Sequence, residues 1–175
     1  MDLKLQKQQK SIGGIDMNRI EVLRKYIDDI LLNMTDVEER RCGYLHLYGV
    51  AQSCALIALK RGENAELATM AGMLHDIYSY SKMDTNEHAH KGAELSREIL
   101  TSLEITNDNE TNIICGAIYN HSSKGIVHCD FDEVLKDADV LQHCLYNPTF
   151  EIMPHERERF EKLKEEFALV GRYEK

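Results

Sequence analysis

The sequence lacks the features that would place it in a membrane or on a nucleic acid. We find no apolar run that approaches the roughly 20 residues of a membrane-spanning helix, and residues 1–16 lack the apolar stretch of a secretory signal. Positive charge is scarce, since 21 Lys and Arg face 30 Asp and Glu, for a net charge of -9. This balance disfavours nucleic acid and anionic membrane surfaces as partners. We therefore expect a cytoplasmic protein.

The cysteines lack a pattern that would indicate disulfides or a zinc knuckle. Their number is odd and no two form a CxxC pair. Buried thiols in a reducing compartment are the simplest interpretation. The five are Cys42, Cys54, Cys115, Cys129 and Cys144.

Alternation of apolar and polar residues, the mark of a half-buried strand, is also missing. Apolar residues instead recur at intervals of three and four, which predicts an all-α, single-domain helical bundle of about seven helices. We expect residues 1–16, which are polar and basic and include Gly13 and Gly14, to form a flexible tail. The helical domain is then 17–175, with its informative core at about 40–145.

Several residues mark where the predicted helices begin and end. Gly62 and Pro148 are expected to end helices, Pro154 to lie in the first turn of the last helix, and residues 79–86 to form a polar loop. Side chains that could cap helices are Asn18, Thr35 with Glu38 as its capping-box partner, Asn64, and Asp130 with Glu133.

Four potential metal ligands lie inside or at the end of apolar helical patterns: His46, His75, Asp76 and Asp139. Imidazoles and carboxylates are costly to bury unless something pairs with them, and a divalent metal ion is a common partner. Each residue alone is better explained as a hydrogen-bonded core residue. The combination is more specific than any of its members.

The order and context of these residues resemble the HD-domain metal-dependent phosphohydrolase superfamily, whose signature is H…HD…D on an all-helical bundle. The matching segments are HLYGVA with His46, LHDI with His75 and Asp76, and DADVL with Asp139. The resemblance implies an all-α fold of the HD type. It also implies a hydrolase for phosphoesters or phosphoanhydrides that uses metal-activated water, with Asp76 as a catalytic residue.

Two further segments resemble those of two-metal members of the superfamily. HAHKGAELSREIL is similar to the HxxxGA segment and places His88 four residues before Gly92, while AIYNHS carries His121. His90 is a rival to His88, but the two point about 200° apart on a helix, so only one can face the metal. The resemblance implies two ions bridged by Asp76, drawn from Fe, Mn, Zn, Ni or Mg.

Subfamily signatures narrow the expected substrate only in part. The HDxxED pattern of (p)ppGpp hydrolases and the HDxGK and GYP patterns of cyclic-di-GMP phosphodiesterases are missing. The chain resembles small two-metal bacterial HD proteins of the YqeK type, and this resemblance implies a nucleotide or a related small phosphate as substrate. Lys91, Ser122 and Lys124 neighbour the expected ligands and are candidates for binding its phosphate. For the two lysines an ordinary solvated surface charge is the favoured interpretation, and Ser122 could equally be the polar end of a helix.

Three other features leave alternatives open. The missing subfamily lysine also fits a non-catalytic module that senses metal or nucleotide. His143 lies four residues after Asp139 on the same helical face and could support the site or be a buried polar residue. His128 is expected in a loop and His155 in solvent.

An apolar stripe on the last helix predicts core packing or a homodimer contact: Phe160, Leu163, Phe167 and Val170.

Overall fold

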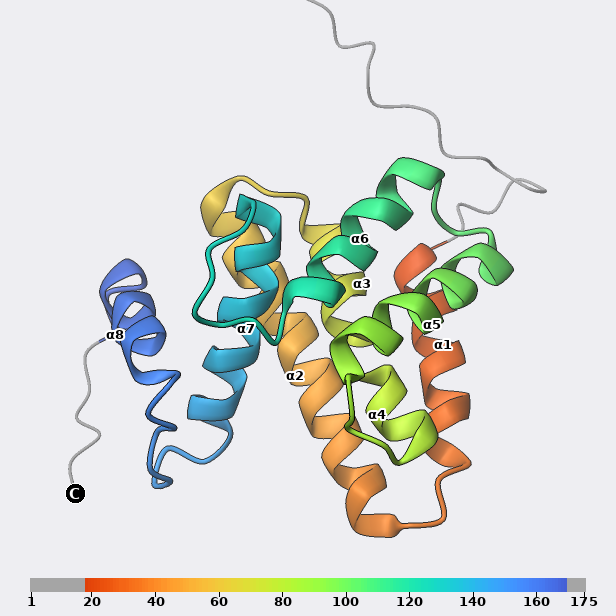
Figure 1. The fold of residues 1–175 in the computed structure, drawn as a ribbon, viewed down its shortest axis with the longest axis horizontal. Coiled ribbons are helices and arrows are strands. Elements are labelled where there is room, and N and C mark those ends of the chain that lie inside the picture. The colour runs from red at the N-terminus through yellow and green to blue at the C-terminus, as the bar shows by residue number, and fades with distance from the viewer. Residues whose placement is uncertain (1–17, 170–175) are drawn as a thin grey trace, which may run out of the picture.

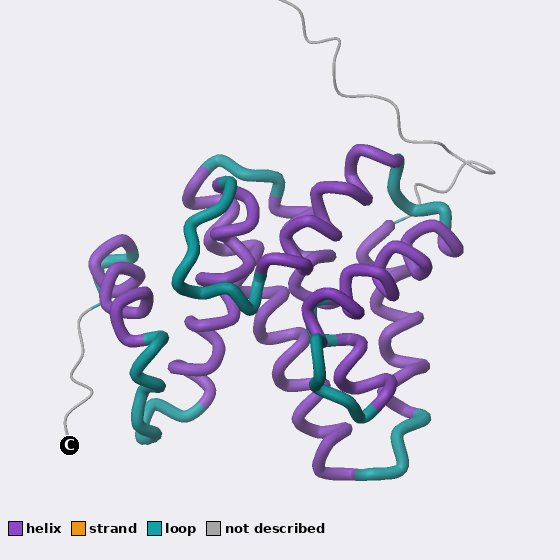
Figure 2. The backbone as a smooth tube through the Cα atoms, viewed as in Figure 1, coloured by secondary structure: helices purple, strands orange, loops and turns teal. Residues whose placement is uncertain are grey.

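The computed structural model describes residues 18–169, which form helices and connecting loops without a strand (Figures 1 and 2). The prediction of an all-α fold is confirmed. The predicted tail, 1–16, lies outside the described residues. The helices are α1 (Arg19–Leu32), α2 (Val37–Arg61), α3 (Ala65–Leu74), α4 (Ile77–Lys82), α5 (His88–Leu103), α6 (Asp108–Asn120), α7 (Asp130–Tyr146) and α8 (Arg157–Glu166).

Helix α2 is the centre of the bundle and packs mainly on α3 and α7. Helices α5 and α6 form a pair that contacts α3 through α6, and α8 lies at one edge against α7 (Figure 1). A close approach of α2 and α3 is at Gly72 of α3, where an added Cβ would lie 2.6 Å from the backbone Cα of Ala51 in α2. Two helix backbones can approach this closely only where one residue has no side chain.

The apolar length of α2 corrects one expectation. By length and composition α2 could cross a membrane, so the chain does contain an apolar run of that size. In the bundle, however, this helix packs against α1, α3, α4 and α7, so one of its faces belongs to the core. The residues that it buries are Gly43, Leu47, Val50, Ala51, Cys54, Ile57 and Ala58.

Predicted helix starts are right for two helices. The Asn18 side chain accepts a hydrogen bond from the Glu21 amide at 3.2 Å, and Asn64 caps α3 in the same way. The predicted end of α2 is also right, because Gly62 follows it with a φ of 78°, a left-handed conformation that favours glycine.

Two predicted caps are wrong. Asp36, not Thr35, caps α2, because its carboxylate accepts hydrogen bonds from the amides of Glu38 and Glu39. Helix α7 has Cys129 at its cap position without a side-chain hydrogen bond, so Asp130 is already helical.

Two predicted boundaries are also wrong. Residues 79–86 were expected to be a loop, but buried Ile77 anchors the short helix α4, which ends at Lys82. Helix α8 begins at Arg157, later than predicted, because residues 154–156 form a turn in which the Met153 carbonyl accepts from the amides of Glu156 and Arg157.

The apolar stripe on α8 packs into the core. Phe160 and Leu163 are buried and Phe167 packs against the same cluster, whereas Val170 lies outside the described residues. The cysteines divide into two sets. The expectation of burial holds for Cys54, Cys115 and Cys144 and is wrong for Cys42 and Cys129, which are exposed.

Candidate metal centre

Four residues that are far apart in the chain converge where α2, α7 and the α3–α4 junction meet. The Nε2 atom of His46 lies 3.0 Å from that of His75. It also lies 3.5 Å from Asp76 Oδ2 and 3.6 Å from Asp139 Oδ1. His75 and Asp139 are buried and the other two are half-buried. We call His46, His75, Asp76 and Asp139 the first group.

Two further histidines approach the other oxygen of Asp76. Its Oδ1 atom lies 3.4 Å from His121 Nε2 and 3.7 Å from His88 Nε2. We call Asp76, His88 and His121 the second group. Because Oδ2 faces the first group and Oδ1 faces the second, one carboxylate connects both.

Local backbone geometry decides which side chains enter the centre. Asp76 lies at the break between α3 and α4 with φ −112° and ψ 14°, so the helix does not continue through it. On α5, His88 faces Asp76 while His90 stacks on Tyr119, with ring centroids 4.0 Å apart and 10° between the planes. The structure thus places His88, and not its rival, beside the carboxylate.

All four histidines of the two groups share one hydrogen-bonding pattern. The Nδ1 atoms of His75 and His121 lie 2.8 and 2.7 Å from the carbonyls of Gly72 and Ile118. His88 Nδ1 lies 3.1 Å from the Thr85 carbonyl. The fourth, His46, pairs through Nδ1 with Gln142 Oε1 at 2.9 Å. An Nδ1–H donated to an oxygen assigns the lone pair to Nε2, the atom that faces the carboxylates.

The electrostatics of the centre favour ionised carboxylates and a neutral His75, while at His46 the Asp76 and Asp139 carboxylates outweigh burial and raise the pKa. Complete burial lowers the pKa of His75 to about 3, so this imidazole is neutral at physiological pH. Burial opposes ionisation of Asp139, but the Lys124 ammonium, which is hydrogen-bonded to its Oδ2, holds the pKa of that carboxyl below its usual range. Neutral imidazole and ionised carboxylate are the forms that bind a metal ion.

Two carboxylate oxygens in the centre are left without a hydrogen bond. Asp76 Oδ1 and Asp139 Oδ1 are buried and have no donor among the described residues. An ionised oxygen in that state is strongly destabilising unless a cation neutralises it. The donor set of imidazole nitrogens and carboxylate oxygens fits a divalent transition metal. The residues present therefore fit the group that the sequence predicts.

The sequence indicated only some of the residues that surround the metal centre. Gln142 and Glu156 were missed, although Gln142 lies three residues after Asp139 and so on the same face of α7. His143, noted for its spacing, lies 3.4 Å from Asp139 Oδ1 through Nε2 and 2.9 Å from Glu156 Oε1 through Nδ1. No sequence signal pointed to Glu156, which comes from beyond α7.

Besides His90, two histidines lie away from the centre. His155 is exposed, as expected. His128 pairs with the buried ammonium of Lys136 at 2.5 Å.

The predicted phosphate-binding residues lie in different surroundings. Lys124 bonds to Asp139 as described above. Lys91 donates to Asp84 at 3.3 Å and its ammonium lies 5.3 Å from the centroid of the Tyr78 ring. Ser122 is exposed directly after His121. Their role in substrate binding stays a prediction.

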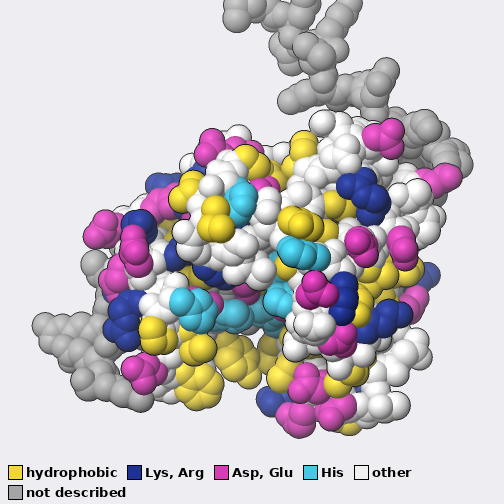
Figure 3. Space-filling view, in the orientation of Figure 1, with side chains coloured by type: hydrophobic (Ala, Val, Ile, Leu, Met, Phe, Trp, Pro, Cys, Tyr) yellow, Lys and Arg dark blue, Asp and Glu magenta, His cyan; other side chains and the backbone are white. Residues whose placement is uncertain are grey.

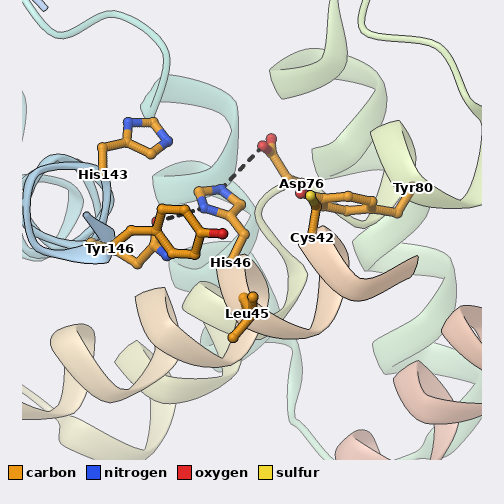
Figure 4. Close-up of a pocket in the computed structure, with 8 residues that line it drawn as sticks. Cys42, Leu45, His46, Asp76, Tyr80, His143 and Tyr146 are labelled. Carbon is orange, nitrogen blue, oxygen red and sulfur yellow. Dashed lines mark hydrogen bonds and ion pairs between the residues drawn. The ribbon is translucent and has the colours of Figure 1, made fainter. Parts of the chain in front are cut away.

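A cavity of about 320 Å³ opens onto the first group. Figure 3 shows histidine side chains gathered across a hollow in this face of the molecule. In Figure 4, His143 and Tyr146 lie on one side of His46, and Asp76, Cys42 and Tyr80 on the other. Leu45 and Gln142 complete the lining. The cavity therefore has polar groups at the centre and aromatic rings on both sides.

Comparisons with known proteins agree with this arrangement. A crystal structure described as a predicted HD superfamily hydrolase from an uncultured Thermotogales bacterium resembles this fold with a TM-score of 0.51, at 20% sequence identity, over 86% of this chain and 87% of that one. At that identity the likeness concerns the fold alone. No curated protein matches the chain. The family model of the HD domain matches residues 43–143, more than half of the chain. The chain therefore belongs to the HD domain family.

Proposed function

We propose that this protein is a metal-dependent phosphohydrolase with two divalent ions. The first group, His46, His75, Asp76 and Asp139, would hold one ion, and His88 and His121 would hold the second with Asp76 shared between them. The observation that carries the proposal is the pair of buried carboxylate oxygens, on Asp76 and Asp139, that face imidazole Nε2 atoms and have no hydrogen-bond donor among the described residues. Fe, Mn, Zn, Ni and Mg all suit such donors to some degree.

The bound ions would supply a Lewis acid and water of lowered pKa at neutral pH. The chain's own residues would orient the metal ligands and neutralise part of their charge. Asp76 connects both groups, and Gln142 fixes the ring of His46 through Nδ1. Lys124 occupies Oδ2 of Asp139 and leaves Oδ1 turned toward the histidines. Such outer partners hold ligands in place and tune their basicity.

The cavity supports a small phosphorylated substrate. A volume of about 320 Å³ is at the lower end of the usual range for small-molecule sites. A substrate whose phosphate lies at the metal ligands would have its apolar or aromatic part between Tyr80 and Tyr146. In a nucleotide, this part would be the base. Nucleoside monophosphates and, by the YqeK-like resemblance, dinucleoside polyphosphates are the proposed candidates.

The remaining proposals concern the surroundings of the protein. The net charge of -9 disfavours nucleic acid and anionic membranes as partners, and a cytoplasmic location stays a proposal. A homodimer is a further proposal, although the α8 stripe that suggested it is used inside the core, where Phe160 and Leu163 are buried.

One observation favours a second candidate, a metal-binding or nucleotide-binding module without turnover. The described residues that line the cavity include no lysine or arginine, so no cation of the chain itself faces a substrate phosphate there. Phosphate recognition would then depend on the metal ions. Turnover that depends on Asp76 would exclude this alternative.

Metal analysis and a substrate panel test the proposal together. Plasma mass spectrometry of the full chain should find about two equivalents of a divalent metal, reduced in His75→Ala and Asp76→Ala. The loaded protein should hydrolyse a member of a panel of nucleoside monophosphates, diadenosine polyphosphates and p-nitrophenyl phosphate, and Asp76→Ala should not. His155→Ala, at an exposed histidine, is the matched control. The enzyme proposal would be overturned by folded protein that binds no metal after loading, or that binds metal but hydrolyses no member of the panel.

A further inference from the structure

The centre has a fifth imidazole, that of His143, which lies against Asp139 and belongs to neither group. His143 Nε2 is 3.4 Å from Asp139 Oδ1, closer than His46 at 3.6 Å and His75 at 3.8 Å. That oxygen is buried and accepts no hydrogen bond within the described part of the chain. Three imidazole nitrogens therefore surround one carboxylate oxygen that has no hydrogen-bond donor in residues 18–169. The possible ligand atoms of His46, Asp139 and His143 all lie within 4.8 Å of one another.

The other nitrogen of His143 is held by a buried carboxylate. Its Nδ1 atom lies 2.9 Å from Oε1 of Glu156, which is only 3% exposed. A carboxylate behind an imidazole fixes the tautomer and ring orientation of metal-bound histidines and raises their basicity. With the proton on Nδ1, the Nε2 lone pair of His143 faces Asp139, as in His46 and His75.

Glu156 reaches this position through packing of the C-terminal segment. It directly precedes α8, whose residues Phe160 and Leu163 are buried in the core. Arg159 donates to Asp137 of α7 and to the Lys124 carbonyl, which ties the same segment to two more points around the centre. Glu156 lies beyond 43–143, the residues that the HD family model matches. The carboxylate is therefore supplied by a part of the chain outside the matched domain.

We propose that His143, oriented by Glu156, is an additional ligand of the metal ion held by the first group. The inference rests on the proposed metal centre and adds one imidazole to its first position. One more protein ligand leaves one position fewer for water or substrate, so the first ion should be the more tightly bound of the two. The ring of His143 is 45% exposed at the cavity, which gives an entering ion access to Nε2.

Cobalt titration of the metal-free full chain tests this ligand without relying on activity. Binding would be followed by calorimetry and by the visible absorption of Co²⁺, which changes with its ligands. His143→Ala should weaken the tighter binding step and alter the absorption band. Glu156→Gln keeps the shape but removes the charge, and it should weaken that step by about tenfold, the lower end for an outer partner of a metal ligand. His155→Ala, at the exposed neighbour of Glu156, should behave as the wild type.

Asp139→Ala separates failure of this inference from failure of the proposed function. If Asp139→Ala loses cobalt while folded His143→Ala binds it with unchanged affinity and spectrum, the metal centre stands and His143 is not a ligand. If Asp139→Ala also binds cobalt as the wild type does, the metal centre itself is wrong. Circular dichroism would establish folding, and His143→Gln would replace His143→Ala if the alanine variant did not fold, with the same expected losses.

Discussion

At the scale of single residues, Gly72 sets how closely α2 and α3 can pack beside the centre. A Cβ at this position would lie 2.6 Å from Ala51 Cα and 2.8 Å from Ala51 N, both backbone atoms that cannot move alone. Its carbonyl also accepts from His75 Nδ1. We therefore expect Gly72→Ala to lower the free energy of unfolding by about 1–3 kcal/mol, the usual cost of overpacking, and to weaken metal binding. Urea denaturation and cobalt titration would measure both effects.

Gly116 offers the matched control for that substitution. It is also a helical glycine, in α6, but a Cβ there would meet nothing within 4 Å. Gly116→Ala should leave stability unchanged or raise it by about 0.5–1 kcal/mol, because alanine loses less backbone entropy in a helix. Equal destabilisation by both alanines would show that close packing is not the cause at Gly72.

At the scale of elements, α7 and α8 are joined by an ion-pair network that titrates in acid. Glu133 of α7 accepts from Lys136, from the His128 amide and from Arg159 of α8. Burial opposes its ionisation, but these three donors outweigh burial and lower the pKa of Glu133 to about 2 from 4.5. A carboxyl with a lowered folded pKa stabilises the fold above its unfolded pKa, and this contribution is lost as the pH falls through the folded one.

We therefore expect Glu133→Gln to destabilise the protein by about 2 kcal/mol at neutral pH, the scale for hydrogen bonds to charged groups. The difference from wild type should stay constant down to about pH 4.5 and shrink between there and pH 2. Denaturant titrations at several pH values would measure it. Glu158→Gln, at an exposed ion pair with Lys162 on α8, is the control and should change stability little. A pH-independent difference for Glu133→Gln would contradict the assignment.

At the scale of the whole molecule, the centre joins helices that are far apart in the chain. Its residues come from α2, the α3–α4 junction, α5, the end of α6 and α7. Because the folded state alone brings these residues together, a metal ion would bind the folded protein and not the unfolded chain. At a free concentration about one hundredfold above its Kd, one ion would stabilise the fold by about 2.7 kcal/mol, which is roughly 5–10 °C in Tm for a chain of this size.

Chelation should therefore lower the Tm of the wild-type protein in differential scanning calorimetry. Asp76→Asn keeps the size of the side chain but removes the charge shared by both groups, so its Tm should respond much less to chelator. A wild-type Tm that is the same with and without chelator would argue that no ion is held between these helices.

Much of the fold follows from local patterns in the sequence. Apolar spacing of three and four indicates the helices, and Asn18, Asn64 and Gly62 mark boundaries that the structure bears out. The errors occur where neighbouring residues compete. Asp36 displaces Thr35 as a cap because its carboxylate accepts two amide hydrogen bonds, and α4 forms where a polar segment is anchored by one buried residue, Ile77.

Residue spacing and composition were enough to predict the all-α class and the kinds of residue available for a metal centre. Both depend on local spacing and side-chain chemistry, which are visible along the chain. Packing of the helices is what places each oxygen of Asp76 beside a different set of histidines and turns His90 away to Tyr119. It also brought Glu156 to His143. These contacts depend on how helices distant in sequence pack together, and no local pattern specifies that packing.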